Sequence, residues 1–396
     1  MEKKLDDVLN SFVASNDEVE VRNKLLAAGF VLANKDGVTY TGTAGRLDFD
    51  PSSPAYTPDS MSWVASLTKL GTAVAMLQLV ERGIIELDVD IRDTLPELAA
   101  MPVLRGFSDD GKPILEEHGR EITLRHLLSH TLAICMDIPD PDLTRWSKYV
   151  GRTDNYMSWT IEGITTPLKY APGEGWCYGA AYDWAGLLLT RLTGKTLEQY
   201  MQENVFQPLG MTSTSYRPKT IPGSEARSLA LAFSDEKGVL GPGPSPVPEE
   251  YPFEQGGCGL FSAPADYARL LHGILGHKVL KPETTDLLFA PQLNDIQRGI
   301  VMENAAQKRK QGFSPELPRD IPLDHGLGGL LSMEDDPGKR RKGSLMWSGM
   351  TNGRWWIDRQ TGIAGAVLTH LLPYGNRVLE DMYDALERTA YESLGI

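Results

Sequence analysis

The sequence predicts an α/β protein of the α+β type, in which one antiparallel β-sheet is flanked by helices and built from both chain ends. β-like runs occur near the N-terminus and again near the C-terminus, while helical patterns and Pro-rich loops fill the middle. The economical assembly is a single sheet with a mostly helical region inserted between its halves. We expect a sheet domain from residues 1–83 and 322–396, an inserted domain from residues 84–321, and the functional site in the cleft between them.

The N-terminal elements follow from periodicity and turn residues. Apolar side chains at helical spacing predict a helix over residues 4–28. Residues 29–45 predict a β-hairpin, because two β-rich runs flank a turn sequence at residues 35–37. Residues 66–83 predict the best helix of the chain, since apolar positions recur every three or four residues and a final glycine supplies the stop.

The second half of the chain contains one irregular stretch, several β-like runs and a closing helix. Residues 238–252 contain five Pro and three Gly, which predicts irregular structure. Residues 342–351, 353–358 and 363–372 are β-like runs separated by turn residues, and residues 376–394 predict a closing helix.

Composition narrows the function classes. The formal net charge is −14 and no run of Lys and Arg is long enough to reverse that balance, which disfavours nucleic acid as a partner. Three cysteines without a C-x-x-C pair indicate structural thiols rather than a disulfide framework or a zinc site. The seven histidines are scattered, so we expect no metal. The N-terminus lacks a secretory apolar stretch and no run is long enough to span a membrane, so we expect a cytoplasmic protein without membrane contact.

One short motif stands out because of its context. Ser66 and Lys69 form an S-x-x-K at the start of the long apolar helix, whereas a second copy, Ser234 to Lys237, lies in a polar stretch. Residues three apart share a helix face, so Lys69 can reach the Ser66 hydroxyl. The helix N-terminus favours negative charge, and burial favours a neutral amine that can activate a serine. The alternative is that Ser66 caps the helix and Lys69 is a surface charge.

Two further segments complete a candidate site. Tyr178 follows a Gly-rich loop and precedes a strong helix, so its hydroxyl can face a cleft; the alternative is a core tyrosine. Residues 342–351 form a β-like run that ends in small residues, where a backbone N–H can approach a bound carbonyl; the alternative is an ordinary strand.

The chain resembles the serine β-lactamase fold, also called β-lactamase/transpeptidase-like, in the order of three motifs. They are Ser66-x-x-Lys69, Tyr178 and Trp347-Ser348-Gly349. The resemblance covers nearly the whole chain and is strongest to the class C β-lactamase and family VIII esterase branch. Within that branch, segments such as MPVLRGFSDDGKPIL, WCYGAAYDWAG, HGLGGLLSMED and RRKGSLMWSGMTN are similar to fungal lovastatin-type acyltransferases.

The resemblance implies a role for each matched residue. Ser66 would be the acylated nucleophile, and Lys69 and Tyr178 would share the proton transfers, with either as the acylation base. Backbone N–H groups of Ser66 and Met350 would form the oxyanion hole. The residues expected to bind substrate are Trp347, Ser348, Gly349, Tyr374 and His325.

Two departures from the lactamase pattern point to the substrate class. Trp347 stands where lactamases place a lysine that helps bind the drug's carboxylate, and Ala180 stands where they place an asparagine. The sequence therefore favours acyl transfer from a small ester or thioester donor, carried by CoA or a carrier protein, to an alcohol of a polyketide-like acceptor, without a cofactor. A carboxylesterase or lactone hydrolase is the alternative; a β-lactamase, a peptidase and a non-catalytic binding protein fit less well. Oligomeric state is left open.

Overall fold

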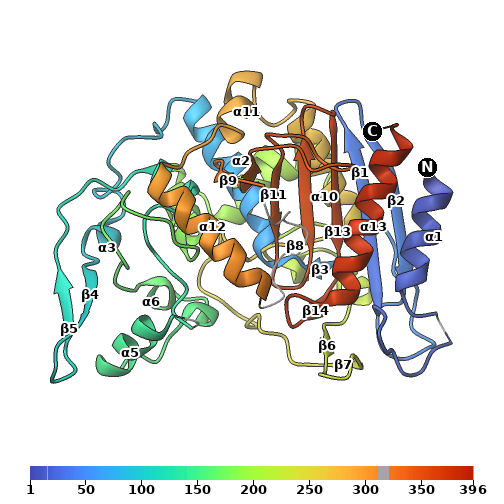
Figure 1. Cartoon of the computed structure of the whole chain (residues 1–396), viewed down its shortest axis with the longest axis horizontal. Helices are drawn as coiled ribbons and strands as arrows, with labels where there is room; N and C mark the ends of the chain where they lie inside the picture. Colours follow the sequence, from blue (N-terminus) through green and yellow to red (C-terminus); the bar gives the residue numbers. More distant parts are fainter. Residues whose placement is uncertain (16, 139, 311–320, 396) are drawn as a thin grey trace.

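Seven antiparallel strands form the central sheet, and they come from both ends of the chain, which confirms the predicted fold class (Figure 1). The computed structural model describes residues 1–396 except 16, 139, 311–320 and 396. The order across the sheet is β2-β1-β13-β12-β11-β10-β9. These strands are β1 (Ala27–Asn34), β2 (Val38–Gly45), β9 (Leu323–His325), β10 (Leu330–Ser332), β11 (Leu345–Ser348), β12 (Arg354–Asp358) and β13 (Ile363–Leu368).

The two chain ends meet where β1 pairs with β13, with Val31 opposite Ala366. On one face of the sheet, α1 (Glu2–Phe12) packs against α13 (Arg377–Ser393), and their apolar sides share one core with the strands (Figure 1). The closing helix agrees with its prediction, whereas the helix predicted over 4–28 ends at Phe12. It ends there because Ser15 turns the chain by bonding to the carboxylate of Glu18.

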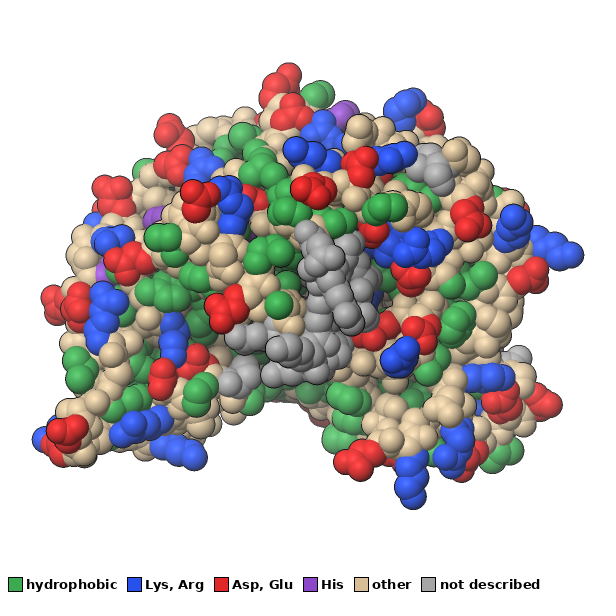
Figure 2. Space-filling model, in the orientation of Figure 1, with side chains coloured by type: hydrophobic (Ala, Val, Ile, Leu, Met, Phe, Trp, Pro, Cys, Tyr) green, Lys and Arg blue, Asp and Glu red, His purple; other side chains and the backbone are tan. Residues whose placement is uncertain are grey.

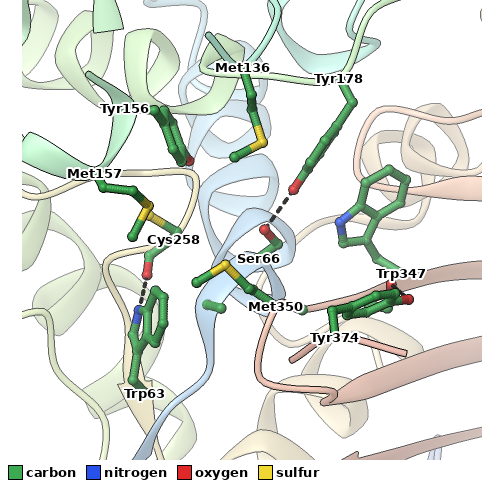
Figure 3. A pocket seen from close by; sticks show the side chains of 13 residues that line it. Trp63, Ser66, Met136, Tyr156, Met157, Tyr178, Cys258, Trp347, Met350 and Tyr374 are labelled. Atoms are coloured by element: carbon green, nitrogen blue, oxygen red, sulfur yellow. Dashed lines mark hydrogen bonds between the residues drawn. The ribbon is translucent and has the colours of Figure 1, made fainter. Parts of the chain in front are cut away.

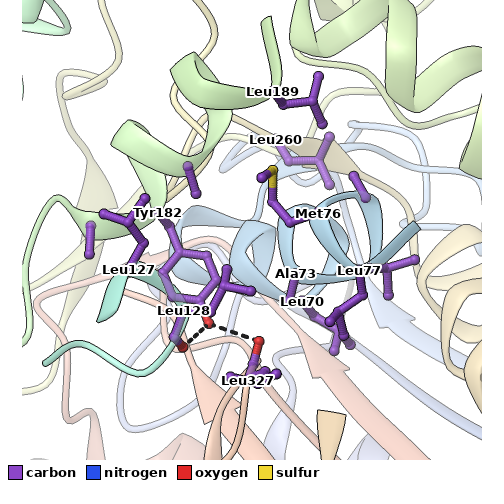
Figure 4. Close-up of a cluster of buried hydrophobic side chains, with 14 of the residues drawn as sticks. Leu70, Ala73, Met76, Leu77, Leu127, Leu128, Tyr182, Leu189, Leu260 and Leu327 are labelled. Atoms are coloured by element: carbon purple, nitrogen blue, oxygen red, sulfur yellow. Dashed lines mark hydrogen bonds between the residues drawn. The ribbon is translucent and has the colours of Figure 1, made fainter. Parts of the chain in front are cut away.

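The other face of the sheet carries the larger core. α10 (Pro264–Leu275) packs on β1 and β13, and α2 (Thr68–Glu81) lies between α7 (Ala181–Thr193) and α11 (Pro282–Leu288). Figure 4 shows the apolar side chains that surround α2. Every α2 side chain from Thr68 to Leu79 is buried, so this helix is covered on all sides. It therefore gives the residues at its N-terminus a rigid and dry support.

The middle of the chain is mostly helical, as expected. Its remaining helices are α3 (Pro96–Ala99), α4 (Leu124–Leu128), α5 (Pro141–Tyr149), α6 (Ile161–Ile164), α8 (Leu197–Met201), α9 (Gln207–Leu209) and α12 (Asp295–Lys310). Short 3-10 turns are η1 (Ala65–Leu67), η2 (Tyr156–Ser158), η4 (Pro218–Thr220) and η5 (Glu225–Arg227), whereas η3 (Gln202–Phe206) is a π-helix. The short strands are β3 (Ser62–Trp63), β4 (Val103–Phe107), β5 (Pro113–Glu116), β6 (Ala232–Ser234), β7 (Leu240–Pro242), β8 (Phe261–Ser262) and β14 (Leu371–Leu372).

Two details differ from the sequence-based prediction of the middle region. β7 lies inside the Pro- and Gly-rich stretch 238–252, where only irregular structure was expected, because its backbone pairs with β6. α10 and β8 come from the expected inserted domain, yet α10 packs on the central sheet and β8 pairs with β3. The proposed division at residue 321 stays a prediction.

The surface shows mixed charge. Lys and Arg side chains are interspersed with Asp and Glu over the face shown in Figure 2, unlike the basic stripe that nucleic-acid binding requires. Within the described residues, each helix is too short or too polar to cross a membrane.

Candidate active site

Ser66 lies at the junction between the short strand β3 and the buried helix α2. The intervening turn η1 contains Ala65 with φ of +47°, a left-handed conformation that is costly for a residue with a side chain. The Thr68 hydroxyl donates to the Ala65 carbonyl (2.6 Å) and accepts from the Leu260 amide (3.0 Å). These bonds hold the turn in place, and the Ser66 side chain lines a cavity.

The Lys69 side chain is buried one helical turn after Ser66, and the residue is 2% exposed. Its Nζ donates to Ser66 Oγ (3.2 Å) and to the Gly257 carbonyl (2.8 Å). The same atom lies 4.8 Å from the centre of the Tyr178 ring. This position excludes the alternative that Lys69 is a surface charge.

Tyr178 reaches Ser66 from the loop that leads into α7 (Figure 3). Its hydroxyl lies 2.6 Å from Ser66 Oγ. The Met136 amide donates to the Tyr178 carbonyl (3.3 Å), which fixes the backbone at this point. The half-buried ring lines the cavity, so the alternative of a core tyrosine does not hold.

Two cysteines correct the expectation that all three are thiols. Cys135 and Cys177 form a disulfide with a Cα–Cα distance of 5.4 Å, while Cys258 is a free, buried thiol. A count of cysteines cannot show that two of them meet in space. The bond joins the residue before Tyr178 to the residue before Met136, so it spans one wall of the cavity.

The turn after β11 packs directly against the Ser66 backbone. A Cβ atom on Gly349 would lie 2.8 Å from the Val64 carbonyl oxygen and 3.4 Å from the Ser66 nitrogen. Only glycine therefore allows this approach. The next residue, Met350, also lines the cavity, so the structure brings together the two residues expected to form an oxyanion hole.

Three more predicted residues lie around the same cavity. The Trp347 ring centre is 5.2 Å from that of Tyr178. The Ser348 Oγ and the Tyr374 hydroxyl are hydrogen-bonded at 2.8 Å. All three side chains contribute to the cavity wall, as expected for residues that contact a ligand.

His325 differs from the expectation that it binds substrate. It is 1% exposed and lies outside the cavity lining, with its ring centre 5.7 Å from that of Trp347. Its Nδ1 is hydrogen-bonded to the Gly326 carbonyl (2.5 Å), and burial lowers the pKa of the imidazole to about 4. His325 is therefore a neutral ring that packs against Trp347 on the side away from the cavity.

The cavity has a volume of about 200 Å³ and a mostly apolar wall. Its residues are Trp63, Ala65, Ser66, Met136, Tyr156, Met157, Tyr178, Cys258, Trp347, Ser348, Gly349, Met350 and Tyr374. Six of them were missed from sequence: Trp63, Ala65, Met136, Tyr156, Met157 and Cys258. They come from four separate segments and carry no motif, so only the fold brings them together.

Sequence reasoning also missed Asp183, in the first turn of α7. It is fully buried, and its Oδ1 accepts a hydrogen bond from the Gly257 amide (2.8 Å). Burial raises the pKa of this carboxyl to about 6, although the nearby Lys69 charge opposes the rise. Its signal was present in the sequence, because it is the one charged residue in the apolar run AAYDWAGLLL.

The geometry defines a class of chemistry. A serine hydroxyl that contacts both an amine and a phenol is the arrangement of an activated nucleophile. Ser66 and Met350, whose backbone amides are the expected oxyanion-hole donors, both line the cavity where such a hydroxyl would attack a carbonyl. Enzymes that transfer acyl groups through a serine ester use these components. Within the described residues, no three His, Cys, Asp or Glu side chains form a group that could hold a metal ion.

Comparison with known proteins identifies the family. The sequence model of the Beta-lactamase family matches residues 9–389, so the chain belongs to that family. Simvastatin synthase from Aspergillus terreus has the same fold, with a TM-score of 0.88 and 30% identity over 98% of this chain and 97% of that one.

Two curated relatives have the same sequence identity to this chain over different lengths. Monacolin J acid methylbutanoyltransferase from Aspergillus terreus is 34% identical over 94% of this chain and 93% of its own length. Lovastatin esterase from Penicillium rubens is 34% identical over 84% of this chain and 85% of its own length. The protein is therefore an enzyme of the acyltransferase or carboxylesterase type in the fungal lovastatin-type branch of its family.

Proposed function

We propose that the protein is a serine acyltransferase that moves an acyl group from a thioester to a hydroxyl of an apolar, polyketide-like acceptor. The observation that carries this proposal is the contact of Ser66 Oγ with Tyr178 (2.6 Å) and Lys69 (3.2 Å) at the wall of an apolar cavity. The named activity of the monacolin J acid relative supports it. The donor thiol belongs to CoA or to a carrier protein.

The first half-reaction forms an ester on Ser66. Its Oγ attacks the thioester carbonyl carbon, and its proton passes to the Lys69–Tyr178 pair. The backbone N–H groups of Ser66 and Met350 stabilise the oxyanion, an effect typically worth about 2.7–4 kcal/mol for each donor. The C–S bond then breaks, and the thiol leaves with the proton that the pair received.

The second half-reaction transfers the acyl group. The acceptor hydroxyl gives its proton to the same pair and attacks the ester carbon, and Ser66 Oγ recovers a proton as its bond to the acyl group breaks. Met136, Met157 and Met350 contribute to the wall around Ser66. Such an apolar wall favours an apolar alcohol over water at this step.

A second candidate is a carboxylesterase, in which water takes the place of the alcohol. The relative named lovastatin esterase supports this candidate, because its sequence identity to this chain, 34%, equals that of the transferase. The two functions share the Ser66 ester and differ only in the acceptor that removes the acyl group. An experiment that separates them must therefore follow the acyl group after the ester has formed.

The test uses the full chain with the N-acetylcysteamine thioester of butyric acid. Intact mass at early times should show one butyryl group on the wild type and on Ser234→Ala, which changes the other S-x-x-K serine, but none on Ser66→Ala. If an added apolar alcohol speeds thiol release and a butyrate ester appears, the protein is a transferase. If free butyrate is the sole product, it is an esterase. An adduct that persists in Ser66→Ala would refute the assignment of the nucleophile.

A further inference from the structure

A buried carboxylate that the proposed mechanism does not use lies next to Lys69. Asp183 lies in the first turn of α7, shortly after Tyr178 in the sequence, and it is fully buried. One oxygen accepts the Gly257 amide (2.8 Å), and the Tyr156 hydroxyl is the side-chain donor that faces the carboxylate. A charged group held with so few partners is costly, which calls for a reason beyond packing.

The Gly257 peptide connects this carboxylate to the nucleophile. Its amide donates to Asp183 Oδ1 (2.8 Å), and its carbonyl accepts from Lys69 Nζ (2.8 Å). A Cβ on Gly257 would lie 2.8 Å from Asp183 Oδ2, so the carboxylate rests directly on the glycine backbone. Within the described part of the chain, no carboxylate oxygen makes a direct ion pair with Lys69. Asp183 is thus the negative charge that attracts it.

The other ionisable groups around Asp183 do not carry charge. They are Tyr156, Cys258 and Tyr216, from three further segments of the chain. Burial raises the pKa of each well above its usual value, so all three stay protonated at neutral pH. Burial also raises the pKa of Asp183 to about 6, which leaves it ionised at pH 7 and above.

We propose that Asp183 is a positioning residue that holds Lys69 Nζ against Ser66 Oγ. This inference rests on the proposed function. Lys69 Nζ donates both to Ser66 Oγ (3.2 Å) and to the Gly257 carbonyl (2.8 Å), and the amide of that same Gly257 is held by Asp183. The Asp183 carboxylate therefore fixes the backbone on which Lys69 rests and attracts the amine toward it. Without that charge, Lys69 loses its fixed place beside the nucleophile, and the Lys69–Tyr178 pair accepts the Ser66 proton more slowly.

The test measures acylation of Ser66 from pH 5 to pH 9 in a single turnover of p-nitrophenyl butyrate, at the wavelength where the phenol and phenolate absorb equally. For the wild type, we expect the rate to fall below about pH 6, where Asp183 gains a proton. Asp183→Asn keeps the shape and the acceptor oxygen but removes the charge. We expect it to acylate at least tenfold more slowly at pH 8 and to lose the fall near pH 6.

A matched control is Asp266→Asn. Asp266 is a second fully buried carboxylate, on α10, where it accepts from the Ser213 amide and the Thr214 hydroxyl. This variant should keep the wild-type rate profile. Thermal unfolding at pH 8 adds a second readout, since Asp183→Asn should keep or raise the melting temperature while it lowers activity. A residue with a merely structural role would lower both.

Each outcome decides the proposal. A fall near pH 6 that persists in Asp183→Asn would assign the titration to another group, such as His130, whose ring centre is 5.0 Å from that of Tyr178, and would overturn the inference. An unchanged rate at pH 8 would do the same. If Asp183→Asn does not fold, a wild-type profile that is flat through pH 6 overturns it. If the wild type forms no ester on Ser66, the proposed function itself fails.

Discussion

Single residues decide how closely the turn after β11 approaches Ser66. Gly349 has no room for a side chain, because a Cβ would lie 2.8 Å from the Val64 carbonyl oxygen. We expect Gly349→Ala to push this turn away from Ser66 and to move the Met350 amide off the oxyanion. Loss of one such donor lowers kcat by about 100-fold to 1000-fold. Single-turnover acylation of the variant measures this loss.

A matched control for that change is Gly241→Ala. Gly241 lies in β7 and has open space around it, because a Cβ atom added there would meet nothing within 4 Å. We expect this variant to acylate at the wild-type rate. If Gly349→Ala also keeps that rate, Met350 does not contribute to the oxyanion hole.

Residue-level prediction worked where chemistry depends on local spacing. Ser66 and Lys69 are three positions apart, so one helical turn brings them together whatever surrounds it. His325 shows the limit of such reasoning. It was expected to bind substrate, but the fold buries its ring next to Trp347 and outside the cavity lining.

At the scale of elements, the loop that carries Tyr178 depends on a covalent link. The Cys135–Cys177 disulfide closes a loop with a sequence separation of 42 residues. Chain-entropy arguments give about 4 kcal/mol for a loop of this size. We expect Cys135→Ser to lower the free energy of unfolding by about 2–4 kcal/mol and to reduce kcat, because Tyr178 follows directly after Cys177. Urea unfolding and ester turnover measure the two effects.

A thiol reductant provides the control for the Cys135→Ser variant, because it breaks the same disulfide without a substitution. A thiol reductant should change the wild type in the same direction as Cys135→Ser does, and it should leave the Cys135→Ser variant unchanged. If the reductant affects both proteins alike, its effect does not come from the Cys135–Cys177 disulfide.

Element boundaries were harder to predict than element types. Residues 66–83 were expected as one helix, but the structure begins with the turn η1 and continues as α2. The difference matters because Ala65 takes a left-handed conformation that no periodicity reveals. β7 was hidden for a related reason, since its Leu240 amide donates to the Val21 carbonyl, a partner far away in the sequence.

At the scale of the whole molecule, the site is assembled from segments that are distant in the sequence. An antiparallel sheet built from both chain ends could be predicted, because pairing of the ends is the simplest way to bury their strands. The contact of Lys69 with Gly257, and of Gly257 with Asp183, could not. These contacts depend on how α2 and α7 pack, which no local pattern encodes.

Buried ionisable groups make the stability of the whole fold depend on pH. Burial lowers the pKa of His325 and His370 from 6.5 to about 4. Their contribution to stability is therefore present above pH 6.5 and is lost as the pH falls, by about 2 kcal/mol for each histidine at pH 5. Asp183 acts in the opposite direction, because its pKa is raised from 3.8 to about 6 and its protonation recovers about 1 kcal/mol. The two histidines outweigh it, so we expect a net loss of about 3 kcal/mol from pH 8 to pH 5.

Urea unfolding at pH 8 and pH 5 measures this difference, and histidine variants locate it. His370 is hydrogen-bonded to the Leu229 carbonyl (2.8 Å), a bond that the amide of His370→Gln can replace. We expect His370→Gln to reduce the pH dependence by about 2 kcal/mol. His277→Gln is the control, because this exposed ring meets solvent in both states. Equal pH dependence in the wild type and in His370→Gln would show that His370 gains its proton without unfolding. Acid loss of stability would then come from the other histidines whose pKa burial lowers, which are His325, His126 and His118.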